Sequence, residues 1–142
     1  MCYLLAIGAI ADPLQIRAFF EEQLEVDVAV AQATILAAFP TEDVVWLLTR
    51  GRCSCELLEL SASTRTPAPA EALWLTPACR RVLAIAAAEL GGLRIYLKSR
   101  RQWRPGGGRL SMTIGELLEG RAAVPADVLV DVVLGIPVGE LN

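Results

Sequence analysis

The hydrophobic pattern at the start of the chain predicts a strand followed by a helix. Residues 3–10 form an apolar run with the length of a buried strand. Asp12 and Pro13 then combine a helix-capping carboxylate with a proline at the first helical position. Apolar side chains beyond them recur at helical spacing: Ile16, Phe19, Phe20 and Leu24. These residues predict an amphipathic helix that packs on the first strand.

The next part of the chain predicts further strands. Residues 25–30 alternate apolar and polar positions with a period of two, as a half-buried strand does. Residues 43–49 predict a buried strand around the apolar run 44–48, and we expect residues 55–60 to return beside it as the second strand of a hairpin. Residues 33–39 fit either a short helix or a strand.

A second long helix is predicted in the middle of the chain. Thr76 and Pro77 repeat the combination of capping residue and proline. The helix that they begin is expected to run to Leu90, where Gly91 and Gly92 end it.

The last part of the chain predicts two strands and a short helix. Residues 93–98 alternate apolar and basic side chains, which indicates a half-exposed strand. Thr113 and Glu116 have the spacing of a capping box, so we expect a short helix that runs to Glu119. Residues 128–134 are apolar except Asp131, and they predict a final buried strand.

Together these elements predict one α+β domain that spans residues 1–142. We expect a mixed sheet of about five strands with two main helices on one face. Residues 61–70 have loop composition and are interpreted as a surface loop of that domain. A composition of 54% hydrophobic and 20% charged residues suits a packed globular chain.

The absence of histidine and the scarcity of lysine exclude several kinds of catalytic and metal site. The chain contains no histidine, so Ser-His-Asp and Cys-His catalysis, imidazole metal ligands and a histidine pH switch are excluded. Lys98 is the single lysine and therefore the single candidate for Schiff-base chemistry. A net charge of −3 indicates no general affinity for nucleic acids or membranes.

The N-terminal apolar run does not have the pattern of a targeting segment. It lacks a basic flank, and Asp12 interrupts it well before the length that would span a bilayer. We therefore expect a cytoplasmic protein that does not enter membranes. Its thiols should then stay reduced, which favours packed thiols, metal ligands or a redox pair over structural disulfides.

The segment after the strand at 43–49 has the most distinctive chemistry of the chain, because Cys53 and Cys55 lie one residue apart. In an extended strand their Cβ atoms would be about 6.5–7 Å apart. Two thiolates on one zinc ion lie about 3.8 Å apart, so the pair needs a turn to converge. Gly51 permits such a turn.

Basic neighbours would favour the thiolate form of these cysteines. Arg50 and Arg52 adjoin Cys53 and Cys55. Cys79 lies near a predicted helix N-terminus beside two arginines, so we expect its pKa to be lowered as well. The alternative is that these cysteines are inert and fill apolar space.

A basic stretch provides a different candidate. It contains an aromatic residue among arginines, with a glycine-rich segment after them: Arg100, Arg101, Trp103 and Arg104. Arginine contacts to phosphate with stacking on tryptophan would suit an anion or single-stranded nucleic acid. We favour the alternative, in which the stretch from Arg94 to Arg109 is a solvated edge strand that its charges protect against aggregation.

Two short segments resemble those of an uncharacterised bacterial family. Its members begin with Met-Cys-x-Tyr-Leu and carry a Gly-x-Cys-Ser-Cys segment further along, which Met1-Cys2 and residues 51–55 match here. The order Tyr3-Leu4 departs from the family pattern by one position. The resemblance covers residues 1–60 and implies that Cys2, Cys53 and Cys55 belong together. It implies no activity.

The leading hypothesis is therefore a small cytoplasmic protein with a cysteine site. Its members would be Cys2, Cys53 and Cys55, with or without Cys79, and they would bind a soft metal such as zinc or act as reactive thiols. A homodimeric interaction module without catalytic activity is the main alternative, and single-stranded nucleic-acid binding is a further one.

Overall fold

The computed structural model describes most of the chain. The described ranges are residues 3–9, 12–42, 44–51, 53–58, 72–73, 75–99, 109–119, 124–125 and 127–134. For Cys55, Ala72, Leu73, Ser99 and Pro125 the description covers the backbone and not the side chain.

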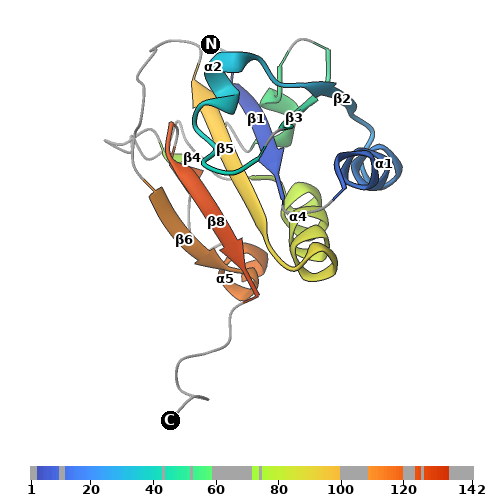
Figure 1. Ribbon diagram of the computed structural model, residues 1–142. Helices are drawn as coiled ribbons and strands as arrows, with labels where there is room; N and C mark the ends of the chain where they lie inside the picture. Colours follow the sequence, from blue (N-terminus) through green and yellow to red (C-terminus); the bar gives the residue numbers. More distant parts are fainter. Residues whose placement is uncertain are drawn as a thin grey trace.

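Six strands form one mixed sheet in the order β2-β3-β1-β5-β8-β6. Their bounds are β1 (Tyr3–Gly8), β2 (Asp27–Val30), β3 (Trp46–Thr49), β5 (Leu93–Ser99), β6 (Arg109–Thr113) and β8 (Leu129–Val133). Neighbouring strands are antiparallel except β6 and β8, which are parallel. A separate antiparallel pair joins β4 (Ala72–Leu73) and β7 (Val124–Pro125). Figure 1 shows β2 and β6 at the two edges of the sheet.

The helices begin where the sequence predicts. In α1 (Pro13–Gln23), the carboxylate of Asp12 accepts a hydrogen bond from the Leu14 N–H. In α4 (Pro77–Leu90), the hydroxyl of Thr76 accepts one from the Cys79 N–H, and Gly91 ends the helix in the left-handed conformation. These contacts satisfy backbone groups that a helix end leaves unpaired.

The shorter helices are also settled by local contacts. Thr113 and Glu116 bond each other's backbone N–H at 3.0 Å, which confirms the capping box at α5 (Ile114–Glu119). The ambiguous segment 33–39 contains a helix, α2 (Ala33–Leu36).

The two faces of the sheet are covered differently (Figure 1). Leu5 and Ile7 of β1 belong to the larger apolar cluster, which also contains the buried residues of α1, α4 and α5. Leu4 and Ala6 belong to a smaller cluster on the other face, beneath α2. Successive side chains of a strand point to opposite faces, so β1 contributes to both clusters. The predicted α+β domain with a mixed sheet and two main helices on one face is confirmed.

Two local predictions were wrong. The expected hairpin strand at 55–60 is instead a 3₁₀ turn over Cys55–Leu57, while residues 59–60 lie outside the described residues. The strand at 93–98 is not a solvated edge: β5 lies between β1 and β8 in the interior of the sheet. None of the described helices has the length and apolar character needed to cross a membrane.

Candidate functional site

The Cys-Ser-Cys turn (residues 53–55) is attached to the sheet through its serine. Ser54 is completely buried, and its hydroxyl accepts a hydrogen bond from the Leu5 N–H at 2.7 Å. The same hydroxyl donates to the Leu48 carbonyl oxygen. Leu5 and Leu48 face each other in the β1–β3 pairing, so the serine side chain links these two strands.

The backbone of the turn is attached to the beginning of β1. The Ser54 N–H donates to the Tyr3 carbonyl oxygen at 2.8 Å. Tyr3 directly follows Cys2 in the sequence, and Ser54 lies between Cys53 and Cys55. The structure therefore brings together two segments that the sequence separates widely.

The backbone leading into residues 53–55 is not extended. The Arg50 N–H donates to the Cys53 carbonyl oxygen at 2.9 Å, and Gly51 between them has a φ of 74°. A side chain at that position would be strained, which accounts for the glycine. The 3₁₀ turn then begins at Cys55. The predicted turn at Gly51 is confirmed.

The Arg50 side chain is held by the Glu25 backbone and the Glu56 carboxylate. Its Nε donates to the Glu25 carbonyl oxygen at 2.7 Å, and its Nη1 lies 3.9 Å from the Glu56 carboxylate. Cys53 itself is half-buried against the smaller apolar cluster. Arg52 lies outside the described residues, so its predicted effect on the thiols stays a prediction.

Cys79 lies in a different environment from Cys53. It is completely buried in the larger apolar cluster, on the face of the sheet that α1 and α4 cover. Burial raises the pKa of its thiol to about 12, although the charge of Arg80 acts in the opposite direction. We expected a lowered pKa, and that prediction was wrong because desolvation outweighs the arginine. Cys79 is therefore an inert packing thiol at neutral pH.

The described residues do not test whether Cys2, Cys53 and Cys55 bind a metal ion together. Within the described ranges, no three Cys, Asp or Glu side chains lie together in a way that could hold a metal ion. Cys2 and the side chain of Cys55 lie outside those ranges. The zinc site stays a prediction.

The predicted basic stretch divides into two parts. Arg100, Arg101, Trp103 and Arg104 lie outside the described residues. The three flanking basic residues are described, and each forms an ion pair with a carboxylate: Arg94, Lys98 and Arg109. The charges of these three are therefore balanced within the protein.

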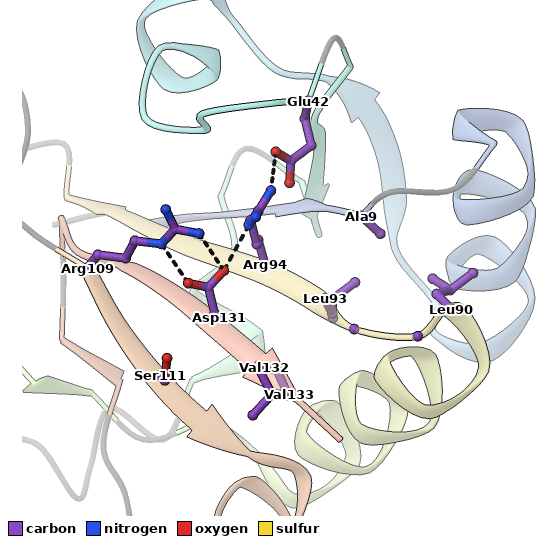
Figure 2. A pocket seen from close by; sticks show the side chains of 12 residues that line it. Ala9, Glu42, Leu90, Leu93, Arg94, Arg109, Ser111, Asp131, Val132 and Val133 are labelled. Atoms are coloured by element: carbon purple, nitrogen blue, oxygen red, sulfur yellow. Dashed lines mark hydrogen bonds and ion pairs between the residues drawn. The ribbon is translucent and has the colours of Figure 1, made fainter. Parts of the chain in front are cut away.

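A second candidate region, which the sequence did not reveal, lies at the other end of β1. Strand register places Gly8 opposite Arg94, Arg94 opposite Asp131, and Ser111 opposite Asp131. These residues form one row across four strands, and Arg94, Asp131 and Ser111 of that row line a cavity of about 310 Å³ (Figure 2). We call this space the polar cavity.

Two arginines and two carboxylates form a chain of ion pairs along this row. The Arg94 Nη1 lies 2.8 Å from the Glu42 Oε1 and donates to the Thr41 Oγ1 at 2.7 Å. The Arg94 Nε lies 2.8 Å from the Asp131 Oδ1, and the Arg109 Nε lies 2.7 Å from the Asp131 Oδ2. Figure 2 shows Glu42, Arg94, Asp131 and Arg109 following one another across the sheet.

The protonation of Asp131 follows from these contacts. Burial alone would raise the pKa of its carboxyl group, but hydrogen bonds from Arg109 and Arg94 outweigh burial and hold the pKa below its usual value. Asp131 is thus a carboxylate at neutral pH. Its charge holds the two arginines beside each other.

Glu42 is the most deeply buried of the four ion-paired side chains. Its side chain is 2% exposed, and its Oε2 is buried with no hydrogen-bond partner among the described residues. A Cβ placed on Gly8 would lie 2.9 Å from that oxygen and 3.1 Å from the Phe39 ring. Only glycine at position 8 leaves room for the carboxylate. An unsatisfied buried acceptor costs about 1–3 kcal/mol, so a donor is expected to reach it.

The rest of the cavity lining is mostly backbone and aliphatic. The end of α4 contributes Leu90, Gly91 and Gly92, and the ends of β1 and β8 contribute Ala9 and Val133. Carbonyl groups at a helix C-terminus lack intrahelical partners and carry partial negative charge. The cavity thus combines charged, apolar and hydrogen-bond-accepting surfaces, which is typical of a small-molecule site.

Comparison of the chain with protein-family models, with curated proteins and with solved structures finds no match in any of the three. The resemblance noted from residues 1–60 therefore stays a prediction.

Proposed function

We propose that the protein binds a soft metal ion, zinc being the leading candidate, through the thiolates of Cys2, Cys53 and Cys55. The observation that carries this proposal is the hydrogen bond from the Ser54 N–H to the Tyr3 carbonyl oxygen at 2.8 Å. It joins the residue between the two nearby cysteines to the residue that follows the distant one.

Chain geometry limits how far apart the three cysteines can be. Each of the three cysteines is next in sequence to Tyr3 or Ser54, which are bonded to each other. Because consecutive Cα atoms are about 3.8 Å apart, the Cα atom of each cysteine lies within that distance of one member of the bonded pair. Leu4 and Ala6 of β1 lie in the apolar cluster against which Cys53 packs. Cys2 precedes Leu4 by two positions in the sequence.

The turn geometry supports convergence of Cys53 and Cys55. In an extended strand, their side chains would be too far apart to share one zinc ion. The Arg50–Cys53 turn and the 3₁₀ turn from Cys55 replace that extended geometry. Three thiolates with one further ligand would complete a tetrahedral site. Cys79 is left out, because it is buried in the other apolar cluster.

The test is the metal content of the full chain purified without an affinity metal. Elemental analysis should find about one zinc ion per chain, and a chelating dye should detect its release when the thiols are titrated with a mercurial reagent. Cys53→Ser and Cys55→Ser should each reduce the metal content to near zero.

Cys79→Ala is the matched control, because it removes a sulfur that we exclude from the site. Its metal content should equal that of the wild type. A metal-free wild type, or an equal loss of metal in Cys79→Ala, would contradict the proposal. Metal-free protein in which Cys53 alkylates rapidly would favour the reactive-thiol alternative instead. Homodimerisation and nucleic-acid binding stay predictions from the sequence.

A further inference from the structure

We infer that the polar cavity binds a small aliphatic molecule that carries both an ammonium group and a carboxylate, with Glu42 receiving the ammonium and Arg109 the carboxylate. This would be a second site, separate from the proposed cysteine site. The cysteine site adjoins Tyr3, at the start of β1, and the cavity is lined by Ala9, directly after the other end of β1. With a rise of about 3.3 Å per residue, the two ends are roughly 17 Å apart.

The Glu42 carboxylate is one anchor of this site. It lines the cavity, is almost completely buried, and has one oxygen with no partner among the described residues. Figure 2 shows its carboxyl group directed from the loop toward Arg94 and the cavity. Arg94 bonds the other oxygen, Oε1. A ligand N–H group is therefore the donor that would complete the hydrogen bonding of Glu42.

Arg109 is the other anchor. Its side chain is 52% exposed on the edge strand β6, and it holds Asp131 through Nε and Nη2. Its Nη1 has no hydrogen bond to any residue that the structure describes. Ser111, two residues further along β6, also lines the cavity and adds a hydroxyl. A ligand carboxylate could accept from both groups, and guanidinium–carboxylate bonds are among the stronger ones.

The charge balance of the cavity selects a zwitterion over a simple ion. Arg94 and Arg109 offset Asp131 and Glu42, so the lining has no net charge from these four side chains. A simple anion would meet the two carboxylates and the negative end of α4 at Leu90. A simple cation would meet the two arginines. A molecule with both charges, oriented as proposed, meets a favourable partner at each end.

The volume of the cavity and its apolar lining indicate the size and skeleton of the ligand apart from its two charged groups. A volume of about 310 Å³ suits a small molecule. Ala9, Leu90 and Val133 offer aliphatic surface at its border. A short aliphatic skeleton is the chemistry that this surface accommodates, as in an aliphatic amino acid.

Three matched probes test the inference on the full-length protein. L-leucine carries both charged groups, 4-methylpentanoate lacks the ammonium, and isoamylamine lacks the carboxylate. Titration calorimetry at neutral pH should show L-leucine binding at least about tenfold more tightly than either matched compound, since each charge-assisted hydrogen bond is worth about a factor of ten or more.

Two variants separate the anchors. Glu42→Gln should reduce the preference for L-leucine over 4-methylpentanoate to less than about threefold, because it removes the charge that attracts the ammonium. Arg109→Gln should weaken binding of both carboxylate-bearing probes by at least about tenfold. Because Arg109 is exposed at an edge, its variant remains informative even where Glu42→Gln fails to fold.

Arg17→Gln is the matched control, since Arg17 is a similarly exposed arginine paired with a carboxylate on α1. It should leave the affinity for L-leucine unchanged. Absence of binding by all three probes, equal binding of all three, or equal loss in Arg17→Gln and Arg109→Gln would overturn the inference. The metal content of the cysteine variants is measured separately, so failure of one proposal does not decide the other.

Discussion

The two ends of β1 carry candidate sites that are built in different ways. At Tyr3, the Cys-Ser-Cys turn is attached by backbone bonds and by one buried hydroxyl, that of Ser54. Beyond Gly8, the polar cavity is assembled from residues of three strands (β5, β6 and β8), from Ala9 and Glu42, and from the end of α4. The first region depends on a short segment that is visible in the sequence. The second depends on strand register, and no sequence motif predicts it.

This difference predicts how each region responds to substitution. Changes in the Cys-Ser-Cys turn should act through the backbone and stability of the sheet. Changes in the polar cavity should act through charge and the placement of side chains. The following measurements test that difference.

The largest expected effect is on the reactivity of Cys79. With the pKa raised to about 12, the thiolate fraction at pH 8 is roughly 10⁻⁴, so native alkylation should be about a thousandfold slower than alkylation of the urea-unfolded chain. Mass spectrometry of timed samples measures both rates. Rapid native labelling of Cys79 would contradict the burial of this thiol and reopen its place in the cysteine site.

Ser54→Ala should destabilise the protein by about 3 kcal/mol, because it leaves the Leu5 N–H and the Leu48 carbonyl without the buried hydroxyl that joins them. Urea denaturation measures the change in the free energy of unfolding. Ser111→Ala is the matched control, since Ser111 is exposed, and it should stay within about 0.5 kcal/mol of the wild type. Equal effects of the two substitutions would remove the special role of Ser54.

Gly8→Ala should cost about 2 kcal/mol and disturb the polar cavity. The new methyl group would lie 2.9 Å from the Glu42 Oε2 and 3.1 Å from the Phe39 ring, so both side chains must move. Gly115→Ala is the control, because its nearest contact is 3.8 Å away and it lies in helix α5. That variant should be neutral or slightly stabilising. A neutral Gly8→Ala would show that Glu42 does not lie against β1.

Asp131→Asn should cost about 1–2 kcal/mol at neutral pH, because two arginines would lose the carboxylate between them. The folded-state pKa of Asp131 is lowered from 3.8, so the unfolded chain takes up this proton more readily. Its stabilising contribution is therefore complete above the unfolded-state pKa and is lost as pH falls through the folded-state pKa. The difference between wild type and Asp131→Asn should shrink on acidification in that range.

Urea denaturation at neutral pH and at several acidic pH values checks this prediction. Glu21→Gln is the control, since the Arg17–Glu21 pair is exposed and contributes at most about 0.5 kcal/mol. A wild-type advantage over Asp131→Asn that grows on acidification would have the wrong sign for this ion pair.

Periodicity was enough to predict the main elements of the fold. The capping residues Asp12 and Thr76 and the Thr113–Glu116 box located three helix starts, because each is a local interaction between neighbours in sequence. β6 was missed although residues 109–113 alternate polar and apolar side chains, because the segment is only five residues long and its pairing with β8 is a tertiary contact. Strand order cannot be deduced from local pattern, so β5 was misplaced as an edge.

The candidate sites show the same limit. Gly51 and the Cys-Ser-Cys segment were visible because turn residues and closely spaced cysteines are local signals. The raised pKa of Cys79 was missed because desolvation depends on what packs over the thiol. Arg94 and Asp131 were visible as charges on predicted strands. Their pairing, and the place of Glu42 above Gly8, required the register of the folded sheet.

The most direct test of two independent sites on one strand is an amide chemical-shift map of the same labelled sample. Removal of metal with a chelator should shift the signals of Tyr3, Leu5 and Ser54. Addition of L-leucine should shift those of Arg94, Ser111 and Asp131 instead. One shared set of shifted residues, or no shift in either experiment, would contradict the assignment of separate sites to the two ends of β1.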